Sequence, residues 1–142
     1  FRISQPCSNF LITDLLKISL QEDFDSVTTT FPRTYPPGLT CEILKTELLT
    51  ENLDAIIEKE DKEHLTSFFY KNPEKFNIKN VSPKNQINFE RINLCVDNDK
   101  DLERAIWISD QMIQTNDNCY NIEEIIALAR EWEENFSRLG KD

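Results

Sequence analysis

The chain has 142 residues with a formal net charge of −10 at pH 7, and 39% of its residues are hydrophobic. This length suits one domain with a hydrophobic core, so residues 1–142 are expected to form a single domain. The acidic balance excludes a nucleic-acid groove, which would need clustered Lys and Arg. The sequence has no run of about 20 apolar residues, which excludes a transmembrane helix.

The cysteines and the first residues bear on the compartment. The cysteines form no C-x-x-C pair, and with a single histidine in the chain this excludes a zinc site. They stand among apolar residues, so we expect free thiols in a cytoplasmic protein; a disulfide such as Cys7 to Cys95 stays open. The four are Cys7, Cys41, Cys95 and Cys119. The chain begins with Phe1 and has no signal peptide, as expected of a fragment or processed piece.

The first third of the chain predicts a helix followed by two strands. Residues 9–21 carry apolar side chains at helical spacing, which indicates a helix with one apolar face. The β-branched run at 26–30 favours a strand, and residues 39–44 favour a second one. Between the strands lies a turn at 32–38, in which prolines fix φ and Gly38 can take a positive φ.

The middle of the chain predicts two amphipathic helices and two more strands. The first helix lies within residues 50–57. Asp61 could cap the second helix, which ends before Pro73. The side chains expected to face inward are Leu53, Ile56 and Ile57 in the first helix and Leu65, Phe68 and Phe69 in the second. The strand candidates are residues 76–81 and 91–96.

The last third predicts two helices, at residues 99–114 and 122–136, each with its apolar residues mostly on one face. Asn121 stands three residues before Glu124, as in a capping box, and Gly140 stands beyond the end of the second helix. Strands that alternate with helices in this way predict an α/β layer fold.

Several kinds of site are excluded by what the sequence lacks. Its only glycines are Gly38 and Gly140, so these residues contain no P-loop, no Rossmann fingerprint and no G-x-S-x-G nucleophile elbow. The acidic stretch at 97–101 resembles the start of an EF-hand loop. It has Leu102 where that loop needs glycine and Ile108 where it needs glutamate, which argues against the EF-hand.

Two carboxylates are candidate site residues. Asp97 directly follows the strand expected at 91–96, and the carboxyl end of a strand in an open α/β sheet is where ligands and metals bind. The alternative is that Asp97 or Asp99 caps the helix that follows. Glu42 lies on a strand of otherwise apolar residues, which indicates a specific partner for its side chain.

Arg33 and His64 are further candidates within the stretch at 26–70, which could form one wall of a pocket. Arg33, in the proline-rich turn, could pair with a carboxylate or phosphate; the alternative is a solvated loop charge. His64, expected at a helix start, could bind an anion, or its ring could cover Tyr35 or Phe68. The residues alone leave both choices open.

Three blocks of the chain carry a family resemblance. They are R-T-Y-P-P-G-L-T-C-E at 33–42, E-H-L-T at 63–66 with Y-K-N-P-E-K-F at 70–76, and V-D-N-D-K-D-L at 96–102. They are similar to three sequence patterns that one protein family shares: R-T-Y-P-x-G-L-x-x-E, E-H-V-T with Y-x-N-P-E-x-F, and V-D-T-P-E-D-L. In this order and spacing they resemble the cytidylyltransferases that activate sugars for surface polysaccharides, the spore-coat polysaccharide branch of the CMP-sugar synthetase superfamily.

The resemblance implies a partial nucleotidyltransferase (Rossmann-like) three-layer fold, with this chain as its C-terminal portion and about residues 26–82 as a dimerisation and sugar-side lobe. It implies a homodimer that transfers CMP from CTP to a sugar and releases pyrophosphate. Mg²⁺ would neutralise charge on the phosphates. In this scheme Asp97 matches a metal-binding aspartate, while Arg33, Glu42 and His64 match positions on the sugar side.

Two departures from the family pattern leave the enzymatic activity open. The family begins with a strand and a glycine- and arginine-bearing loop that holds the nucleotide, and these residues contain neither. The stretch F-R-I-S-Q-P-C at 1–7 resembles the family's R-x-T-x-D-C-P, but Pro6 or Gln5 replaces the first metal-binding aspartate. We therefore expect a cytidylyltransferase-like chain that is incomplete by itself. The alternative is a non-catalytic dimerisation or ligand-binding module of the same ancestry.

Overall fold

The structure, a computed structural model, describes residues 8–114 and 121–139. The expectations for Gln5, Pro6, Cys7 and Cys119 lie outside these described residues. The chain divides into two compact units. We call residues 10–34 and 41–82 the sheet unit, and residues 8–9 and 35–40 with the described part of 83–142 the helical unit. That residues 1–142 form one domain stays a prediction.

A small mixed sheet is the centre of the sheet unit. Its middle strand β1 (Ser26–Thr28) pairs antiparallel with β2 (Glu42–Leu44) and parallel with β3 (Ile78–Asn80). All three strands were expected from their β-branched and apolar residues, and all three are shorter than predicted. β2 begins late because residues 36–39 form a turn, in which the Leu39 N–H donates to the Pro36 carbonyl over 3.0 Å.

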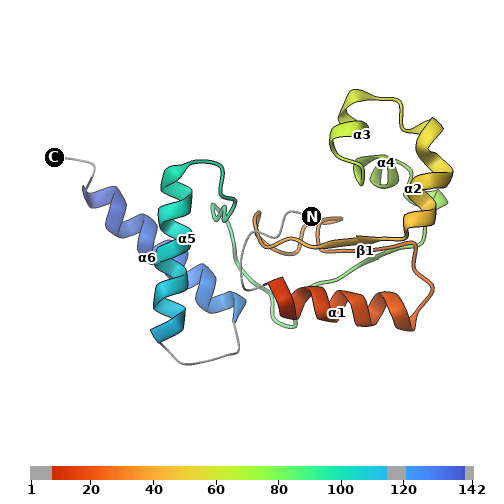
Figure 1. Cartoon of the computed structure of the whole chain (residues 1–142). Coiled ribbons are helices and arrows are strands. Elements are labelled where there is room, and N and C mark those ends of the chain that lie inside the picture. The colour runs from red at the N-terminus through yellow and green to blue at the C-terminus, as the bar shows by residue number, and fades with distance from the viewer. Residues whose placement is uncertain (1–7, 115–120, 140–142) are drawn as a thin grey trace. The chain divides into compact units, whose positions relative to one another are not determined.

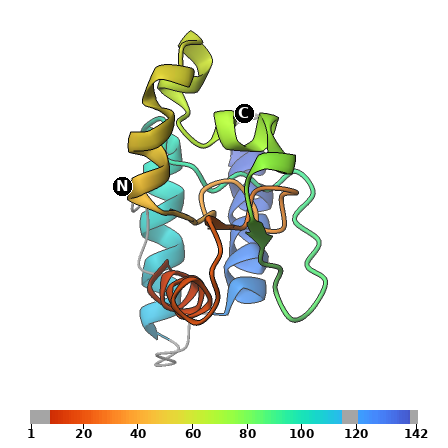
Figure 2. The same cartoon turned by 90° about the vertical axis from the view of Figure 1, so that its right-hand side faces the viewer.

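Helices lie on both sides of this sheet. Figures 1 and 2 show α1 (Ser8–Gln21) on one side and α4 (Ser67–Lys71) on the other. Thr28 bonds Tyr70 of α4, and successive side chains of a strand alternate between faces. Val27, which is fully buried, is thereby directed to the side of α1, where Leu15 is also fully buried. This arrangement confirms the α/β fold class.

The segment between β2 and β3 departs most from the sequence prediction. The helix expected within 50–57 is α2 (Thr46–Asn52) followed by a 3₁₀ turn at Leu53–Ala55. Of the three side chains expected to face inward there, only Ile56 is buried. Asp61 does not cap a helix but lies inside α3 (Lys59–Glu63). In α4 Phe69 is buried, whereas Leu65 before it is 45% exposed; a second 3₁₀ turn, Pro73–Lys75, leads to β3.

The helical unit is built on the two C-terminal helices, as predicted. α5 (Asp99–Gln114) packs against α6 (Ile122–Leu139). Asn121 accepts the Glu123 N–H on Oδ1 over 3.0 Å and so caps α6. The buried core of this unit consists of Leu39, Ile92, Leu94, Ile108, Met112, Ile125, Ile126 and Ala129. No helix in the described ranges is long and apolar enough to cross a membrane.

The strand predicted at 91–96 is wrong. Its backbone groups find partners in a loop and in a side chain instead of a sheet: Leu94 donates its N–H to the Pro37 carbonyl over 2.8 Å, and Cys95 donates to Asn93 Oδ1 over 2.9 Å. Gly38 makes this approach possible. Its φ is +92°, and a Cβ there would lie 2.3 Å from the carbonyl carbon of Leu94.

Candidate functional site

A row of polar side chains crosses the sheet. Thr28 of β1 is paired with Glu42 of the edge strand β2 and with Asn80 of β3. Paired residues of neighbouring strands share a face, so these three side chains lie side by side on the face that α4 covers. Thr28 is fully buried and Glu42 is exposed. Asn80 Oδ1 is buried and has no hydrogen-bond partner within the described part of the chain.

The carboxylate of Glu42 joins three segments that are far apart in the sequence. Tyr70 of α4 donates its hydroxyl to Oε1 in a short contact, and Thr30 donates to the same oxygen over 2.7 Å. Thr66, just before α4, donates to Oε2 over 3.2 Å. The expectation of a specific partner for Glu42 is thus confirmed, but the partners are neutral hydroxyls, not a cation.

The Tyr70 hydroxyl keeps its proton for this contact. Burial, and then its hydrogen bond to Glu42, raise the pKa of Tyr70 to about 12. Its oxygen also lies 2.9 Å from Thr28 Oγ1, so the buried threonine joins the same network. At neutral pH Tyr70 is therefore a fixed donor, and the negative charge of the network resides on Glu42.

An aromatic ring borders this network. The rings of Phe31 and Tyr70 are stacked, with centroids 4.8 Å apart and planes 9° from parallel. Phe31 begins a loop held at its far end by Thr34, whose hydroxyl donates to the Val81 carbonyl over 2.6 Å. We define the Glu42 site as Glu42, its hydroxyl partners and Phe31. Loop, strand and helix converge there.

Arg33 and His64 belong to segments that meet at this site. Arg33 forms an isolated β-bridge with Thr30, and His64 stands two residues before Thr66. His64 follows the end of α3 as its C-cap and does not start a helix, which corrects the prediction. Both side chains are exposed, and neither forms an ion pair or hydrogen bond with a residue that the structure describes.

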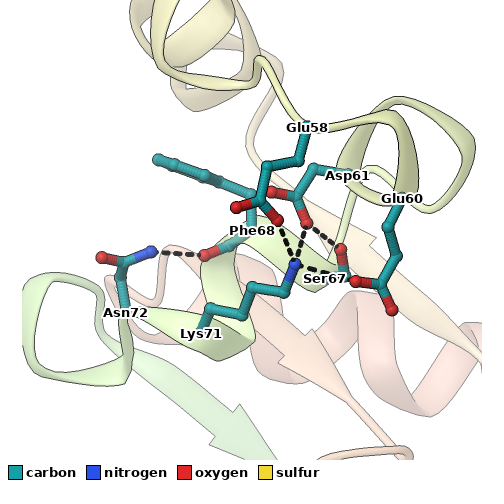
Figure 3. A network of polar contacts seen from close by, with 7 residues as sticks. All are labelled: Glu58, Glu60, Asp61, Ser67, Phe68, Lys71 and Asn72. Atoms are coloured by element: carbon teal, nitrogen blue, oxygen red, sulfur yellow. Dashed lines mark hydrogen bonds and ion pairs between the residues drawn. The ribbon is translucent and has the colours of Figure 1, made fainter.

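A second polar network, which the sequence did not reveal, lies one residue further along α4. The ammonium group of Lys71 is 3.0 Å from carboxylate oxygens of Glu58 and Glu60 and 2.8 Å from Asp61 Oδ1 (Figure 3). Asp61 also accepts a short hydrogen bond from the Ser67 hydroxyl. We call these residues the Lys71 cluster.

The pKa shifts in the Lys71 cluster reflect mutual stabilisation of opposite charges. Hydrogen bonds from Lys71, and then from Ser67, hold the pKa of Asp61 below its usual value. Bonds to Asp61, Glu58 and Glu60 raise the pKa of Lys71. The ligand oxygens of the three acids lie within 4.8 Å of one another, close enough to share a metal ion. Since an ammonium already binds all three, the cluster fits an internal cation better than Mg²⁺.

Asp97 lies in the helical unit, in the loop before α5. Its N–H donates to Asp101 Oδ2 over 3.1 Å, while Asn98 Oδ1 accepts the Asp101 N–H over 3.0 Å. Asn98, and neither Asp97 nor Asp99, is therefore the helix cap. The carboxylate of Asp97 is exposed and does not cap α5. Mg²⁺ is often held by one or two carboxylates together with waters and phosphates, and Asp97 fits such a donor set.

Comparison with known proteins supports the fold. No protein-family model matches the sequence, and no curated protein matches it. A solved structure of a cytidylyltransferase from Leptospira borgpetersenii serovar Hardjo-bovis (strain JB197) is similar to this chain, with a TM-score of 0.63 and 22% sequence identity. The similarity covers 94% of this chain and 53% of that one, so this chain spans about half the length of its structural neighbour.

Sequence reasoning missed several residues of the Glu42 site. It singled out Glu42 but not Tyr70, Thr30 or Phe31, which complete the site. One signal was present, because Tyr70 opens the Y-K-N-P-E-K-F block. Its role could not be deduced from spacing alone, since Tyr70 and Glu42 are 28 residues apart.

Proposed function

We propose that this chain is the sugar-side part of a cytidylyltransferase that activates a sugar for surface polysaccharide, with CTP and the sugar as substrates and pyrophosphate and CMP-sugar as products. The observation that carries the proposal is the similarity to a cytidylyltransferase over 94% of the chain. The three sequence blocks support it further, because they include Arg33, Glu42, His64 and Asp97. A fold alone does not imply a function, so the proposal rests on what these residues can do.

Each of the four residues has a distinct task in this proposal. Glu42, anchored by hydroxyl donors, accepts hydrogen bonds from the sugar. Arg33 and His64 are exposed donors on the converging loops and orient the sugar or its anionic groups. Asp97 would hold Mg²⁺, which when bound neutralises negative charge on the phosphates. The residues of the chain thus position substrates, and correct positioning is itself a large part of catalysis.

The proposal also includes a homodimer in the cytoplasm. Its interface would lie on the sheet unit, where Leu53 and Ile57 are 60% and 74% exposed. An interface there would cover these two exposed apolar side chains. The free thiols Cys41 and Cys95 suit a reducing compartment, which supports a cytoplasmic location.

Calorimetric titration of CTP with Mg²⁺ into the chain tests the proposed function. Because these residues lack the family's nucleotide loop, we expect weak but saturable binding, which Asp97→Asn weakens further, about tenfold or more, because a metal ligand loses its charge. Asp99→Asn is the matched control: it changes a neighbouring exposed carboxylate and should leave the affinity unchanged. Absence of CTP binding by the folded wild-type chain would contradict the proposal and favour the non-catalytic module.

A further inference from the structure

Arg104 of α5 is a cation buried inside the helical unit. It is 7% exposed, and among the residues whose burial the structure describes no other cation is buried. The central carbon of its guanidinium group lies 5.9 Å from the centre of the Trp132 ring, and Nη1 donates to Glu133 Oε1 over 3.3 Å. Both partners belong to α6. A buried tryptophan and an ion pair therefore hold the planar guanidinium group in one orientation.

The other terminal nitrogen of Arg104 holds the loop that carries Asp97. Nη2 donates to the Cys95 carbonyl over 3.0 Å and lies 3.2 Å from Asp101 Oδ1. The second oxygen of Asp101 accepts the Asp97 N–H over 3.1 Å. The backbone is therefore fixed on both sides of Val96, directly at the Cys95 carbonyl and through Asp101 at the Asp97 amide. We call these contacts the Arg104 bridge.

The Arg104 bridge does not use the carboxylate of Asp97. That side chain is exposed and forms no hydrogen bond or ion pair with a residue that the structure describes. The charge of Arg104 is paired with Asp101 and Glu133 instead. Arg104 thus fixes the backbone from which the carboxylate projects without pairing with the carboxylate itself. A ligand of Mg²⁺ needs both properties, because this ion demands near-ideal octahedral geometry and binds charged oxygens.

From these contacts we infer that Arg104 is a positioning residue for Asp97, which orders the loop at 95–97 before a metal–nucleotide complex binds. Without the bridge, ordering of this loop would oppose binding, since fixing a backbone costs conformational entropy. Arg104 is itself buried and acts only through Asp101 and the Cys95 carbonyl. The inference rests on the proposed function, in which Asp97 holds Mg²⁺, and adds a residue to that site.

Amide hydrogen exchange, measured by NMR on the full chain, tests the bridge without any ligand. Arg104→Met removes the guanidinium group, and we expect the Asp97 amide to exchange about five-fold faster because its hydrogen bond is weakened. The Ile125 amide, in the first turn of α6, should keep its rate. Arg130→Met is the matched control, since Arg130 also donates to a backbone carbonyl, that of Asn88, outside this loop.

Arg104→Lys is a second variant that keeps the buried positive charge and so spares the fold. An ammonium lacks the rigid fork of donors with which a guanidinium group binds several acceptors at fixed angles. We therefore expect Arg104→Lys to accelerate exchange of the Asp97 amide as well, with the circular dichroism spectrum of the wild-type chain retained.

Calorimetric titration of CTP with Mg²⁺ measures the consequence for binding. Arg104→Met should weaken the affinity about five-fold, which corresponds to ordering about one residue, and Arg130→Met should leave it unchanged. Asp101→Ala removes the link to the Asp97 amide and should weaken binding to a similar extent. The double variant of Arg104→Met and Asp101→Ala should bind no more weakly than either single variant, because both act through one bridge.

Three results would overturn the proposal. Unchanged exchange at Asp97 in both Arg104 variants would show that the bridge does not order the loop. Equal acceleration at Asp97 and Ile125 would show a general loss of stability instead. Faster exchange at Asp97 with unchanged CTP affinity would show that loop order does not affect binding.

Failure of the inference is distinguishable from failure of the proposed function. CTP binding that depends on Asp97 but is unaffected by Arg104→Met rejects the positioning role alone. Absence of CTP binding by the wild-type chain rejects the cytidylyltransferase and the positioning role with it. Faster exchange confined to Asp97 would in that case leave Arg104 as a residue that orders this loop for the fold.

Discussion

Tyr70 and Lys71 are consecutive residues of α4, and each anchors a polar network of a different kind. Tyr70 and three threonines bind one carboxylate, Glu42, through neutral hydroxyls. Lys71 binds three carboxylates through one ammonium (Figure 3). The first network contains no cation, whereas the second places one ammonium in contact with every carboxylate and compensates one of their three charges.

This difference separates a site that can bind a ligand from one that serves the fold. Hydroxyl donors satisfy a carboxylate without cancelling its charge, so Glu42 can still attract a donor from solvent. In the Lys71 cluster the internal cation occupies the position that a ligand would need. Asp61 is 3% exposed there, and a carboxylate so buried depends on its partner. We therefore expect substitutions in the Lys71 cluster to affect stability first, and substitutions at Glu42 to affect binding first.

The largest effect on stability is expected from Lys71→Met, which keeps the length of the side chain and removes its charge. Three carboxylates would then repel one another, with Asp61 buried and uncompensated. The midpoint of thermal unfolding should fall by several degrees. Lys62→Met, at an exposed position of α3, is the control and should change it little. Equal midpoints for wild type and Lys71→Met would show that the ion pairs of the Lys71 cluster contribute no more to stability than exposed ion pairs do.

The same comparison has a pH dependence. Lys71 lowers the pKa of Asp61, so the ionised acid stabilises the folded chain above its ordinary pKa of 3.8. This stabilisation is lost as the pH falls through the lowered pKa of the folded state. The stability difference between wild type and Lys71→Met should thus be full at neutral pH and shrink in acid. Denaturant unfolding at a series of pH values measures it, and a difference that grows on acidification would contradict the assigned cause.

An intermediate effect is expected from Tyr70→Phe. The change keeps the stacked ring and removes the hydroxyl that Glu42 and Thr28 contact. Loss of one hydrogen bond to a charged group should lower the free energy of unfolding by about 1–2 kcal/mol, as measured by urea denaturation. An unchanged free energy would show that water replaces the hydroxyl at no cost.

The tyrosine also predicts a loss of stability in alkali. The pKa of Tyr70 is about 12 in the folded chain against 10.0 ordinarily, so the folded state retains its proton where the unfolded state releases it. The contribution of Tyr70 to the free energy of unfolding is therefore fully present below pH 10.0 and is lost as the pH rises toward 12. Tyr70→Phe should lack this component, and titration of tyrosinate absorbance in both proteins measures it. A parallel alkaline decline in both proteins would argue against it.

The smallest effect on stability is expected from Glu42→Gln. The amide keeps an acceptor for the hydroxyl donors, and the residue is exposed, so the free energy of unfolding should change by about 0.5 kcal/mol or less. The affinity for the sugar should nevertheless fall. Glu42→Gln would then reduce binding with little loss of stability, whereas Lys71→Met would reduce stability. A stability loss as large as that of Tyr70→Phe would make Glu42 a structural residue first.

The predictable part of the fold was local. The helix at 9–21 and the two C-terminal helices have a clear helical period, and the β-branched run at 26–30 indicated the middle strand. The strand expected at 91–96 is absent because the backbone partners of this segment lie in the loop around Gly38 and in the side chain of Asn93. No local pattern encodes which distant segment will supply those partners.

The sequence by itself determined the α/β class, the acidic surface and the unusual position of Glu42 on an apolar strand. Only the tertiary structure decided what that carboxylate meets, because Tyr70 reaches it across 28 residues of chain. It also decided that Lys71 closes the neighbouring acidic cluster and that Asn98 caps α5 in place of Asp97. The physical reason is the same in each case: hydrogen bonds and ion pairs depend on the distance between atoms in space, which separation along the chain does not specify.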